Sequence, residues 1–243
     1  MAFFEETDST NNEIRRLAEQ GAPHGTLAVA ERQLGGKGRR GRVWTSPAGV
    51  GIWMSMLLRP QIDPMAASML TLVMALSTRR GIEKATGLKS EIKWPNDLLL
   101  NGKKIVGILC EVGPDGHSIV VGIGINLAQP QEYFDAAGLP HGTSLALQGV
   151  PVDMDTDPEW LAQYMTDFGF DRALYTYEAE GFAPYRERYK ALCVNLGRRV
   201  TYDGGAGTAV DVDDEGRLIV RDETGDTRVF TGEVSVKGIY GAV

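Results

Sequence analysis

Short apolar runs along the chain alternate with polar, glycine-rich and proline-rich connections, which predicts strands separated by turns. Seven runs have the composition of strands, at residues 3–7, 27–32, 52–58, 91–94, 98–100, 104–112 and 119–125. Asn101-Gly102 lies between the fifth and sixth of these runs. Both residues tolerate a left-handed backbone, so the pair predicts a tight hairpin.

Apolar residues three and four positions apart predict helices between some of these strands. One helix is expected near Thr10, which fits a capping box with Glu13, and it should end at Gly21. A second helix is expected to begin after Asp63-Pro64, a good N-cap and first-turn pair, and to end at Gly87.

The second half of the chain changes in texture. Residues 129–141 are rich in proline, glycine and polar side chains and are expected to form a long loop. Residues 158–192 have a helical pattern that is interrupted near residues 181–184. From residue 197 onward, short β-rich runs alternate with turns and predict a small β-barrel of about fifty residues.

These patterns together predict an α/β (α+β) fold. Residues 1–193 are expected to form a mixed β-sheet with flanking helices, and residues 194–243 the small barrel.

Positive charge is concentrated in one segment of an acidic chain. The formal net charge is −7, but residues 32–62 contain six lysines and arginines and no aspartate or glutamate. This favours a small anionic ligand over a nucleic acid. The apolar runs are too short for a membrane span, the N-terminus lacks the pattern of a signal peptide, and the two cysteines are far apart. A cytoplasmic protein is therefore expected.

The basic segment includes a glycine-rich loop, Gly35-Gly36-Lys37-Gly38-Arg39-Arg40-Gly41-Arg42. Glycines let backbone N–H groups approach an anion, and arginines add planar donors for carboxylate and phosphate. An ordinary solvated loop is the alternative. The dinucleotide-binding pattern is excluded because no helix is expected after the glycines. The protein-kinase pattern is excluded because its lysine strand and catalytic loop are missing.

Three further motifs carry polar groups at strand ends. Lys93-Trp94-Pro95-Asn96-Asp97 is either a plain connection or a turn whose Asn96 amide faces a nucleotide. Lys104 enters an apolar strand and is expected to point at a specific group, whereas Lys103 is expected to be an exposed hairpin lysine. Gly122-Ile123-Gly124-Ile125-Asn126 indicates either close approach of a ligand or a packed central strand.

In this order the motifs resemble those of the biotin–protein ligase family. The resemblance rests on Ser9-Thr10-Asn11, residues 36–44, Lys93-Trp94-Pro95-Asn96-Asp97, Lys104 and residues 122–126, and it covers most of residues 1–193. Gly232-Glu233-Val234-Ser235 resembles the family's C-terminal region. The resemblance implies a class II synthetase-like catalytic domain followed by an SH3-like β-barrel. It also implies an enzyme that forms biotinyl-5'-AMP from biotin and ATP with Mg²⁺.

The second step implied by the resemblance is transfer of biotin to a lysine of the biotin carboxyl carrier protein of acetyl-CoA carboxylase. Lys104 and Arg39 would be catalytic, and the resemblance assigns no metal ligands. Biotin would be contacted by Ser9, Thr10, Asn11, Gln33, Gly36, Lys37, Gly38, Arg39, Lys104, Gly107 and Gly124. ATP would be contacted by Arg39, Arg40, Arg42, Trp44, Lys93, Asn96 and Asn126. Trp44 and Trp53 would offer flat apolar surfaces to the ligands.

Two departures from the family pattern lead to expectations of their own. Lys37 replaces the family's first loop arginine, so the loop loses one bidentate donor and is expected to retain the adenylate less tightly. The first strand begins at Phe3, so a ligase without a DNA-binding domain is expected, and a homodimer is compatible with the resemblance. The alternatives are a lipoate–protein ligase and a non-catalytic biotin-binding module, which would need the ring contacts but not Lys104.

Overall fold

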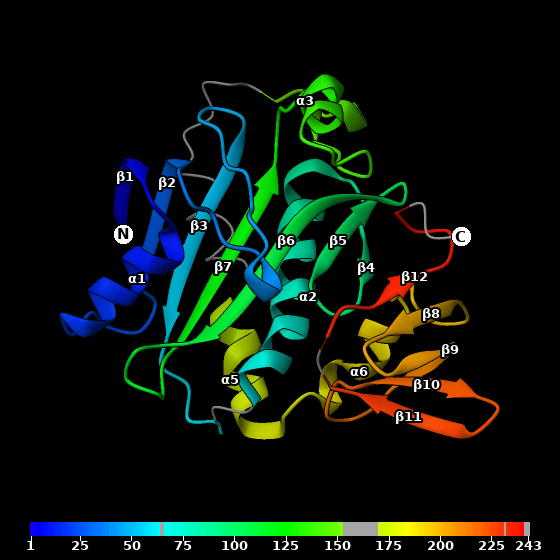
Figure 1. Cartoon of the computed structure of the whole chain (residues 1–243). Helices are drawn as coiled ribbons and strands as arrows, with labels where there is room; N and C mark the ends of the chain where they lie inside the picture. Colours follow the sequence, from blue (N-terminus) through cyan, green and yellow to red (C-terminus); the bar gives the residue numbers. More distant parts are fainter. Residues whose placement is uncertain (64–65, 153–169, 231, 241–243) are drawn as a thin grey trace.

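The computed structural model describes residues 1–63, 66–152, 170–230 and 232–240. A seven-stranded sheet forms its centre, with the strand order β1-β2-β3-β7-β6-β5-β4. The strands span Ala2–Thr7 (β1), Leu27–Gln33 (β2), Gly51–Leu58 (β3), Glu91–Lys93 (β4), Asp97–Leu100 (β5), Lys103–Val112 (β6) and Ile119–Asn126 (β7). Strands β1 and β2 are parallel and the other neighbours are antiparallel, so the predicted mixed sheet is confirmed (Figure 1).

Helices cover both faces of this sheet. They span Thr10–Glu19 (α1), Ala67–Thr86 (α2), Gln131–Ala136 (α3), Phe170–Glu180 (α5) and Ala183–Lys190 (α6). Helix α1 packs on one face through Ile14, which joins Leu57 and Val120 in a small buried cluster. Helices α2, α5 and α6 contribute to the larger cluster on the opposite face. Successive side chains of a strand point to opposite faces of the sheet. A single strand therefore contributes residues to both hydrophobic clusters.

Strand β7 shows how this alternation produces a site. Ile119, Val121, Ile123 and Ile125 belong to the larger core, whereas Val120 packs beneath α1. Gly122, Gly124 and Asn126 share the face of Val120, because a strand repeats every two residues. On the face that α1 covers, β7 therefore contributes a buried apolar side chain at Val120 and only backbone atoms at Gly122 and Gly124.

Several local expectations are confirmed. Asn101 and Gly102 have φ values of 51° and 73°, as the predicted hairpin requires. Helix α2 ends at Gly87, which has a φ of 75°. Helices α5 and α6 are separated near residues 181–184, as the helical pattern indicates. Residues 153–169, which include the first part of the predicted helical stretch, lie outside the described residues.

The predicted capping box at Thr10 is wrong. Ser9 is the N-cap residue and Thr10 is the first residue of α1. Thr10 Oγ1 hydrogen-bonds the side chains of Gln33 and Ser55 instead, and Glu13 accepts a hydrogen bond from the preceding strand. Partners distant in the sequence have therefore overridden the local capping pattern.

Two other helix boundaries differ from expectation. Helix α2 begins at Ala67, later than Asp63-Pro64 suggests, and residues 64–65 lie outside the described part of the chain. Residues 129–141 are not entirely loop, because they include α3. Phe134 is only 2% exposed, and burial of this ring stabilises a helix too short to be stable by itself.

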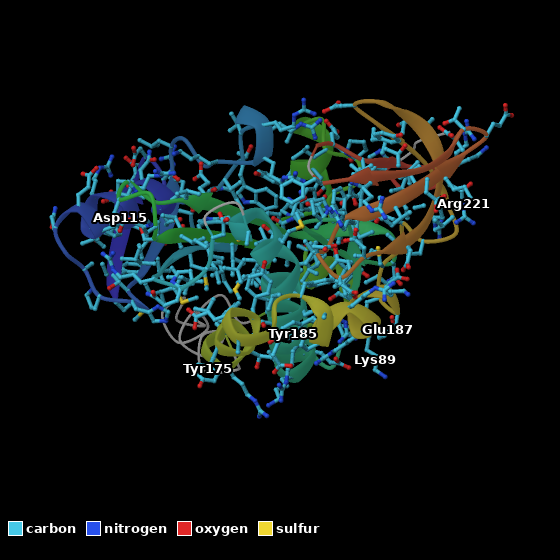
Figure 2. All side chains as sticks on the ribbon, turned by 90° about the horizontal axis from the view of Figure 1, so that it is seen from below. Lys89, Asp115, Tyr175, Tyr185, Glu187 and Arg221 are labelled. Atoms are coloured by element: carbon cyan, nitrogen blue, oxygen red, sulfur yellow. The ribbon has the colours of Figure 1, made fainter. Side chains whose placement is uncertain are left out.

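A second, smaller sheet follows α6. Its strands span Arg199–Tyr202 (β8), Gly205–Val212 (β9), Leu218–Asp222 (β10), Gly225–Val229 (β11) and Ser235–Val236 (β12). All neighbours are antiparallel, in the order β11-β10-β9-β8-β12, which confirms a small all-β unit at the C-terminal end. Figure 2 shows Arg221 in this unit, at the end of the molecule opposite Asp115.

The small sheet shares its core with the large one. Buried Val200, Val212 and Val220 belong to the same hydrophobic cluster as the α2 side chains. Trp94 Nε1 donates to the Gly216 carbonyl at 3.0 Å, so a residue at the end of β4 anchors the β9–β10 turn. The domain boundary after residue 193 stays a prediction. In the described residues, no helix is long and apolar enough to cross a membrane.

Candidate active site

A cavity of about 480 Å³ opens on the α1 face of the large sheet. Its floor comes from β6 and β7, and its walls come from the N-terminus of α1 and the glycine-rich loop. The segment from Pro140 to Gly142 and the C-terminal residues 232–240 contribute further lining side chains. The cavity therefore joins parts of the chain that are far apart in the sequence.

The floor of the cavity is a notch formed by glycines. Gly107 and Gly124 face each other across β6 and β7, and the indole of Trp44 packs into the space above them. A Cβ atom would lie 2.7 Å from the Trp44 ring at Gly107 and 2.5 Å from Trp44 Nε1 at Gly124. Neither position can therefore hold a larger residue while Trp44 stays in place. Trp44 Nε1 is buried without a hydrogen-bond partner, which leaves one donor available at the notch.

Two predicted ligand contacts lie outside the cavity lining. Trp53 is buried, donates from Nε1 to the Pro47 carbonyl at 3.1 Å and meets Trp44 edge to face. It supports Trp44 from the core, so its predicted role as a ligand surface is wrong. Gly36 is also buried, and a Cβ there would lie 2.2 Å from the Trp44 carbonyl oxygen. Its absence from the lining means that Gly36 shapes the loop instead of facing the cavity.

One end of the cavity is a network of polar side chains, and the members that line the cavity, Ser9, Thr10, Asn11 and Gln33, are all uncharged. The Gln33 Oε1 atom accepts hydrogen bonds from the Thr10 backbone at 2.8 Å and from Thr10 Oγ1 at 3.0 Å. Asn11 Nδ2 donates to Glu111 at 2.8 Å, and Asn11 Oδ1 accepts from Ser55. The neighbouring Ser9 is 1% exposed and also lines the cavity. This end offers fixed donors and acceptors with no cation among them, which suits an uncharged polar ligand group.

The other end contains the predicted catalytic lysine. Lys104 Nζ lies 2.6 Å from Asp97 Oδ1 and 5.1 Å from the centre of a Trp44 ring. Burial by itself would raise the pKa of Asp97, but the charges of Lys104 and Lys93 hold that pKa below its ordinary value. The carboxylate of Asp97 holds the Lys104 ammonium in place, so this end offers a fixed positive group.

The glycine-rich loop reaches from the cavity to the small sheet. Arg40 has a φ of 58° and forms an ion pair with Asp203 at 2.6 Å, and Arg42 forms one with Glu233. Arg39 donates to Asn96 Oδ1 and to the Gly232 carbonyl, both at 3.3 Å. Burial lowers the pKa of Arg39, although Asp97 opposes this effect.

Loop residues Lys37 and Gly38 line the cavity beside Arg39. A bridge between Lys37 and Val43 closes the loop as a narrow turn. The Gly38 backbone N–H donates to the Arg42 carbonyl at 2.7 Å, so it is already used within the loop. Lys37 is exposed, which leaves its ammonium able to approach a ligand.

Three further predicted nucleotide contacts line the same cavity. Lys93 lies beneath Tyr240, and burial lowers the pKa of Lys93. Asn96 Nδ2 donates to the Ile108 carbonyl at 3.1 Å. Asn126 is 6% exposed, donating to the Thr143 carbonyl and accepting from Gln129, each at 3.0 Å. Asn126 therefore holds the 143–145 segment in place, and a ligand would have to share its amide.

Comparison with known proteins identifies the family. Residues 3–126 match the Biotin/lipoate A/B protein ligase family, and residues 196–237 match the Biotin protein ligase C terminal domain. The chain belongs to the biotin/lipoate A/B protein ligase family. This confirms the family resemblance that the motifs suggested.

Individual members of the ligase family resemble the chain over almost its whole length. The "Biotin--[acetyl-CoA-carboxylase] ligase" of Paracoccus denitrificans is 36% identical over 243 residues, covering 96% of this chain and 98% of that protein. The "Bifunctional ligase/repressor BirA" of Bacillus spizizenii is 36% identical over 236 residues, covering 94% of this chain and 71% of BirA. The structure of the biotin protein ligase from Aquifex aeolicus in complex with biotin and ATP matches with a TM-score of 0.79 at 29% identity, covering 97% of each chain.

The ligase fold thus brings most of the predicted residues to one cavity. Every residue predicted to contact biotin or ATP lines it except Gly36 and Trp53. Two residues of the site, Asp97 and Tyr240, are not among the predicted contacts. Asp97 is recognisable in the sequence only as the end of a turn motif, and Tyr240 contacts it from 143 positions away. The pairing of Asp97 with Lys104 could have been anticipated from the Asn101-Gly102 hairpin, which brings β5 and β6 together. The assigned roles of the individual residues stay predictions.

Proposed function

We propose that this chain is a biotin protein ligase that joins biotin and ATP into biotinyl-5'-AMP and then transfers biotin to a carrier-protein lysine. The acceptor would be the biotin carboxyl carrier subunit of acetyl-CoA carboxylase. One observation carries the proposal: the neutral polar network, the glycine notch and the cations of the loop and of Lys104 line a single cavity. In that order, the three environments match the uncharged ureido ring of biotin, its apolar chain and its reacting carboxylate.

The first step must bring two anions together. The biotin carboxylate oxygen attacks the α-phosphorus of ATP, the bond to the β-phosphate oxygen breaks, and pyrophosphate leaves. Lys104, Arg39 and Lys37 all face the cavity and can offset the repulsion between carboxylate and phosphate. Fixed charges act strongly in a site sheltered from water, so they stabilise the transition state without rearranging.

The neutral end of the cavity suits the ureido ring of biotin. A urea has one carbonyl acceptor and two N–H donors. Thr10 and Asn11 offer both kinds of group, and Gln33 and Ser55 hold them in fixed positions. Trp44 above the glycine notch would cover the apolar part of the ligand between the ring and the carboxylate.

The second step releases AMP. The carrier lysine amine attacks the carbonyl carbon of the mixed anhydride, an amide bond forms, and the bond to the AMP oxygen breaks while the amine loses a proton. The same cations can stabilise the charge that develops on the phosphate oxygen. A loop closed over the anhydride would protect it from water until the carrier binds.

Mg²⁺ is proposed to enter with ATP. In the part of the chain that the structure describes, no group of three or more histidine, cysteine, aspartate or glutamate residues could hold a metal ion. The acidic residues nearest the reacting end, Asp97 and Glu233, are paired with cations. Mg²⁺ commonly keeps its waters and binds substrate phosphates, so the donor set here does not form a dedicated protein site.

The environment of the enzyme is also proposed. The two cysteines, Cys110 and Cys193, are both free, which supports a reducing compartment such as the cytoplasm. The net charge of −7 disfavours binding to a phosphate backbone, so we propose that the chain does not bind DNA. A homodimer stays a prediction that light scattering can check.

Mass spectrometry of a carrier domain tests the proposed function. The carrier domain is incubated with the protein, biotin, ATP and Mg²⁺, and the expected result is the added mass of one biotinyl group on one lysine. A parallel reaction with lipoate in place of biotin addresses the alternative ligase, and pyrophosphate release measures the first step alone. Release with lipoate but not with biotin would assign the chain to the other branch of the family. Binding of biotin without any pyrophosphate release would indicate a non-catalytic binding module.

A further inference from the structure

We propose that Tyr240 is a positioning residue for the adenylation step, acting on Lys104 through Asp97. Tyr240 Oη donates to Asp97 Oδ2 at 3.1 Å, and Lys104 Nζ lies 2.6 Å from the other oxygen, Oδ1. One carboxylate thus links the catalytic lysine to a side chain from the C-terminal segment. The inference rests on the proposed function only through the role of Lys104.

The ring of Tyr240 contacts two further side chains, Lys93 and His141. Lys93 Nζ lies 5.0 Å from its centre, and the His141 ring stacks on it at 5.7 Å with an interplanar angle of 25°. The His141 carbonyl in turn accepts the backbone N–H of Lys104 at 2.7 Å. Tyr240 therefore contacts both groups that fix Lys104, namely the carboxylate beside its ammonium and the segment beside its backbone.

The hydroxyl of Tyr240 determines which carboxylate oxygens of Asp97 are available to Lys104. Burial and the charge of Asp97 raise the pKa of Tyr240 well above its ordinary value, so the hydroxyl keeps its proton and donates. With Oδ2 occupied, Lys104 meets only Oδ1. An ammonium has three donors, so this single contact orients Lys104 and leaves other donors for the substrate carboxylate.

Removal of the hydroxyl should loosen this arrangement without removing the ring. In Tyr240→Phe, Asp97 loses one of its two donors and can turn toward Lys104, which shifts the ammonium away from the substrate. The rate of biotinyl-5'-AMP formation in a single turnover is expected to fall about tenfold, as for loss of a hydrogen bond to a charged group. The KM values for biotin and ATP should change by less than about twofold, because loss of an interaction made only in the transition state lowers kcat.

Tyr175→Phe is the matched control. Tyr175 lies on α5 with 74% of its surface exposed, at the edge of the molecule (Figure 2). It loses the same hydroxyl without contact with the cavity and should react at the wild-type rate. Equal rates for Tyr240→Phe and wild type would overturn the proposal. A lowered rate with an equally raised KM would also overturn it, because that pattern indicates a substrate contact.

A double-mutant cycle separates positioning from simple packing. If Tyr240 acts through Asp97, then Tyr240→Phe should add little to the defect of Asp97→Asn. Additive losses would show that Tyr240 acts independently of Asp97. Thermal melting of each variant shows whether it is folded. If Asp97→Asn is unstable, Tyr240→Phe alone still tests the proposal, because it retains the stacked ring. Wild-type labelling of the carrier tests the proposed function separately, so failure of one can be told from failure of the other.

Discussion

Lys104 and Asp97 form a partly buried ion pair, 2.6 Å apart, in the cavity that Arg39 of the loop also lines. The two residues lie on adjacent strands, β5 and β6, so a tight hairpin sets their distance. The cation is therefore in place before any ligand arrives, and its function can be tested by direct substitution.

Lys104→Ala should lower the turnover of biotinyl-5'-AMP formation by about 100-fold or more, because a charge aimed at the reacting carboxylate is lost. Pyrophosphate release with saturating biotin and ATP measures the effect. Lys103→Ala is the control, since Lys103 is the preceding residue of β6 and contacts Gln131 instead. Turnover that is the same in Lys104→Ala and wild type would rule out the assigned role.

Gly124→Ala should displace Trp44 from the notch, because the new methyl would lie 2.5 Å from its Nε1 atom. Overpacking of this kind costs about 1–3 kcal/mol of folding free energy, and biotin affinity should fall with it. Calorimetry measures both quantities. Gly35→Ala is the control, because its Cβ would meet a single atom at 3.4 Å. In a Trp44→Ala background the destabilisation by Gly124→Ala should shrink, and an unchanged cost there would show that the ring is not the obstacle.

Asp203→Asn should release the loop from the small sheet in the absence of substrates. The ion pair with Arg40 is exposed, so global stability should change by less than about 1 kcal/mol. Tryptic cleavage after Arg39, Arg40 and Arg42 should nevertheless become faster, as followed by mass spectrometry. Asp226→Asn, which breaks an exposed pair with Arg221 in the same sheet, serves as the control. Biotin and ATP should slow cleavage in every variant, and rates that ignore both substrates would exclude loop closure.

Lys37→Arg should slow the release of biotinyl-5'-AMP, because a planar guanidinium can hold carboxylate or phosphate with two parallel hydrogen bonds. The release rate can be followed after rapid dilution of the preformed complex. Lys89→Arg makes the same change at an exposed position far from the cavity and should have no effect. An unaltered release rate in Lys37→Arg would show that the ammonium of Lys37 retains biotinyl-5'-AMP as well as a guanidinium does.

Acid should weaken the protein partly through Asp97. The pKa of Asp97 in the folded state lies below its ordinary value of 3.8, because the neighbouring lysines outweigh the effect of burial. Its stabilising contribution is therefore complete above pH 3.8 and is lost as the pH falls through the lower, folded-state pKa. The free energy of unfolding should fall more steeply with acid in wild type than in Asp97→Asn. Parallel curves for the two proteins would contradict the low pKa.

The fold was predictable where local chemistry and tertiary structure agree. Asn101-Gly102 specifies its hairpin by backbone conformation alone, and the alternation in β7 places Gly122 and Gly124 on one face whatever packs above them. The capping box failed because Thr10 has better partners in Gln33 and Ser55, which no local pattern reveals. Helix α3 was missed for a similar reason, since its stability depends on the burial of Phe134.

The site was predictable as a set of residues but not as a set of contacts. The motifs identified Lys104 and the loop arginines, yet motif reading cannot distinguish a tryptophan that faces a ligand from one that supports it. Trp44 occupies the notch, whereas Trp53 lies behind it with its donor already used by Pro47. The contact between Tyr240 and Asp97 joins residues 143 positions apart, a separation at which sequence patterns carry no information.

The cavity takes lining residues from Ser9 near one end of the chain to Tyr240 near the other. A ribosome delivers these residues in order, so the loop, the glycine notch and Lys104 are all made before the last wall of the cavity emerges. A nascent chain therefore contains the loop cations, Lys104 and the glycine notch before it contains Tyr240, and the cavity wall formed by Tyr240 is still missing at that stage. Newly made protein should therefore acquire full ligase activity only once residues 232–240 have emerged from the ribosome, so the synthesis of these residues sets when the site is complete.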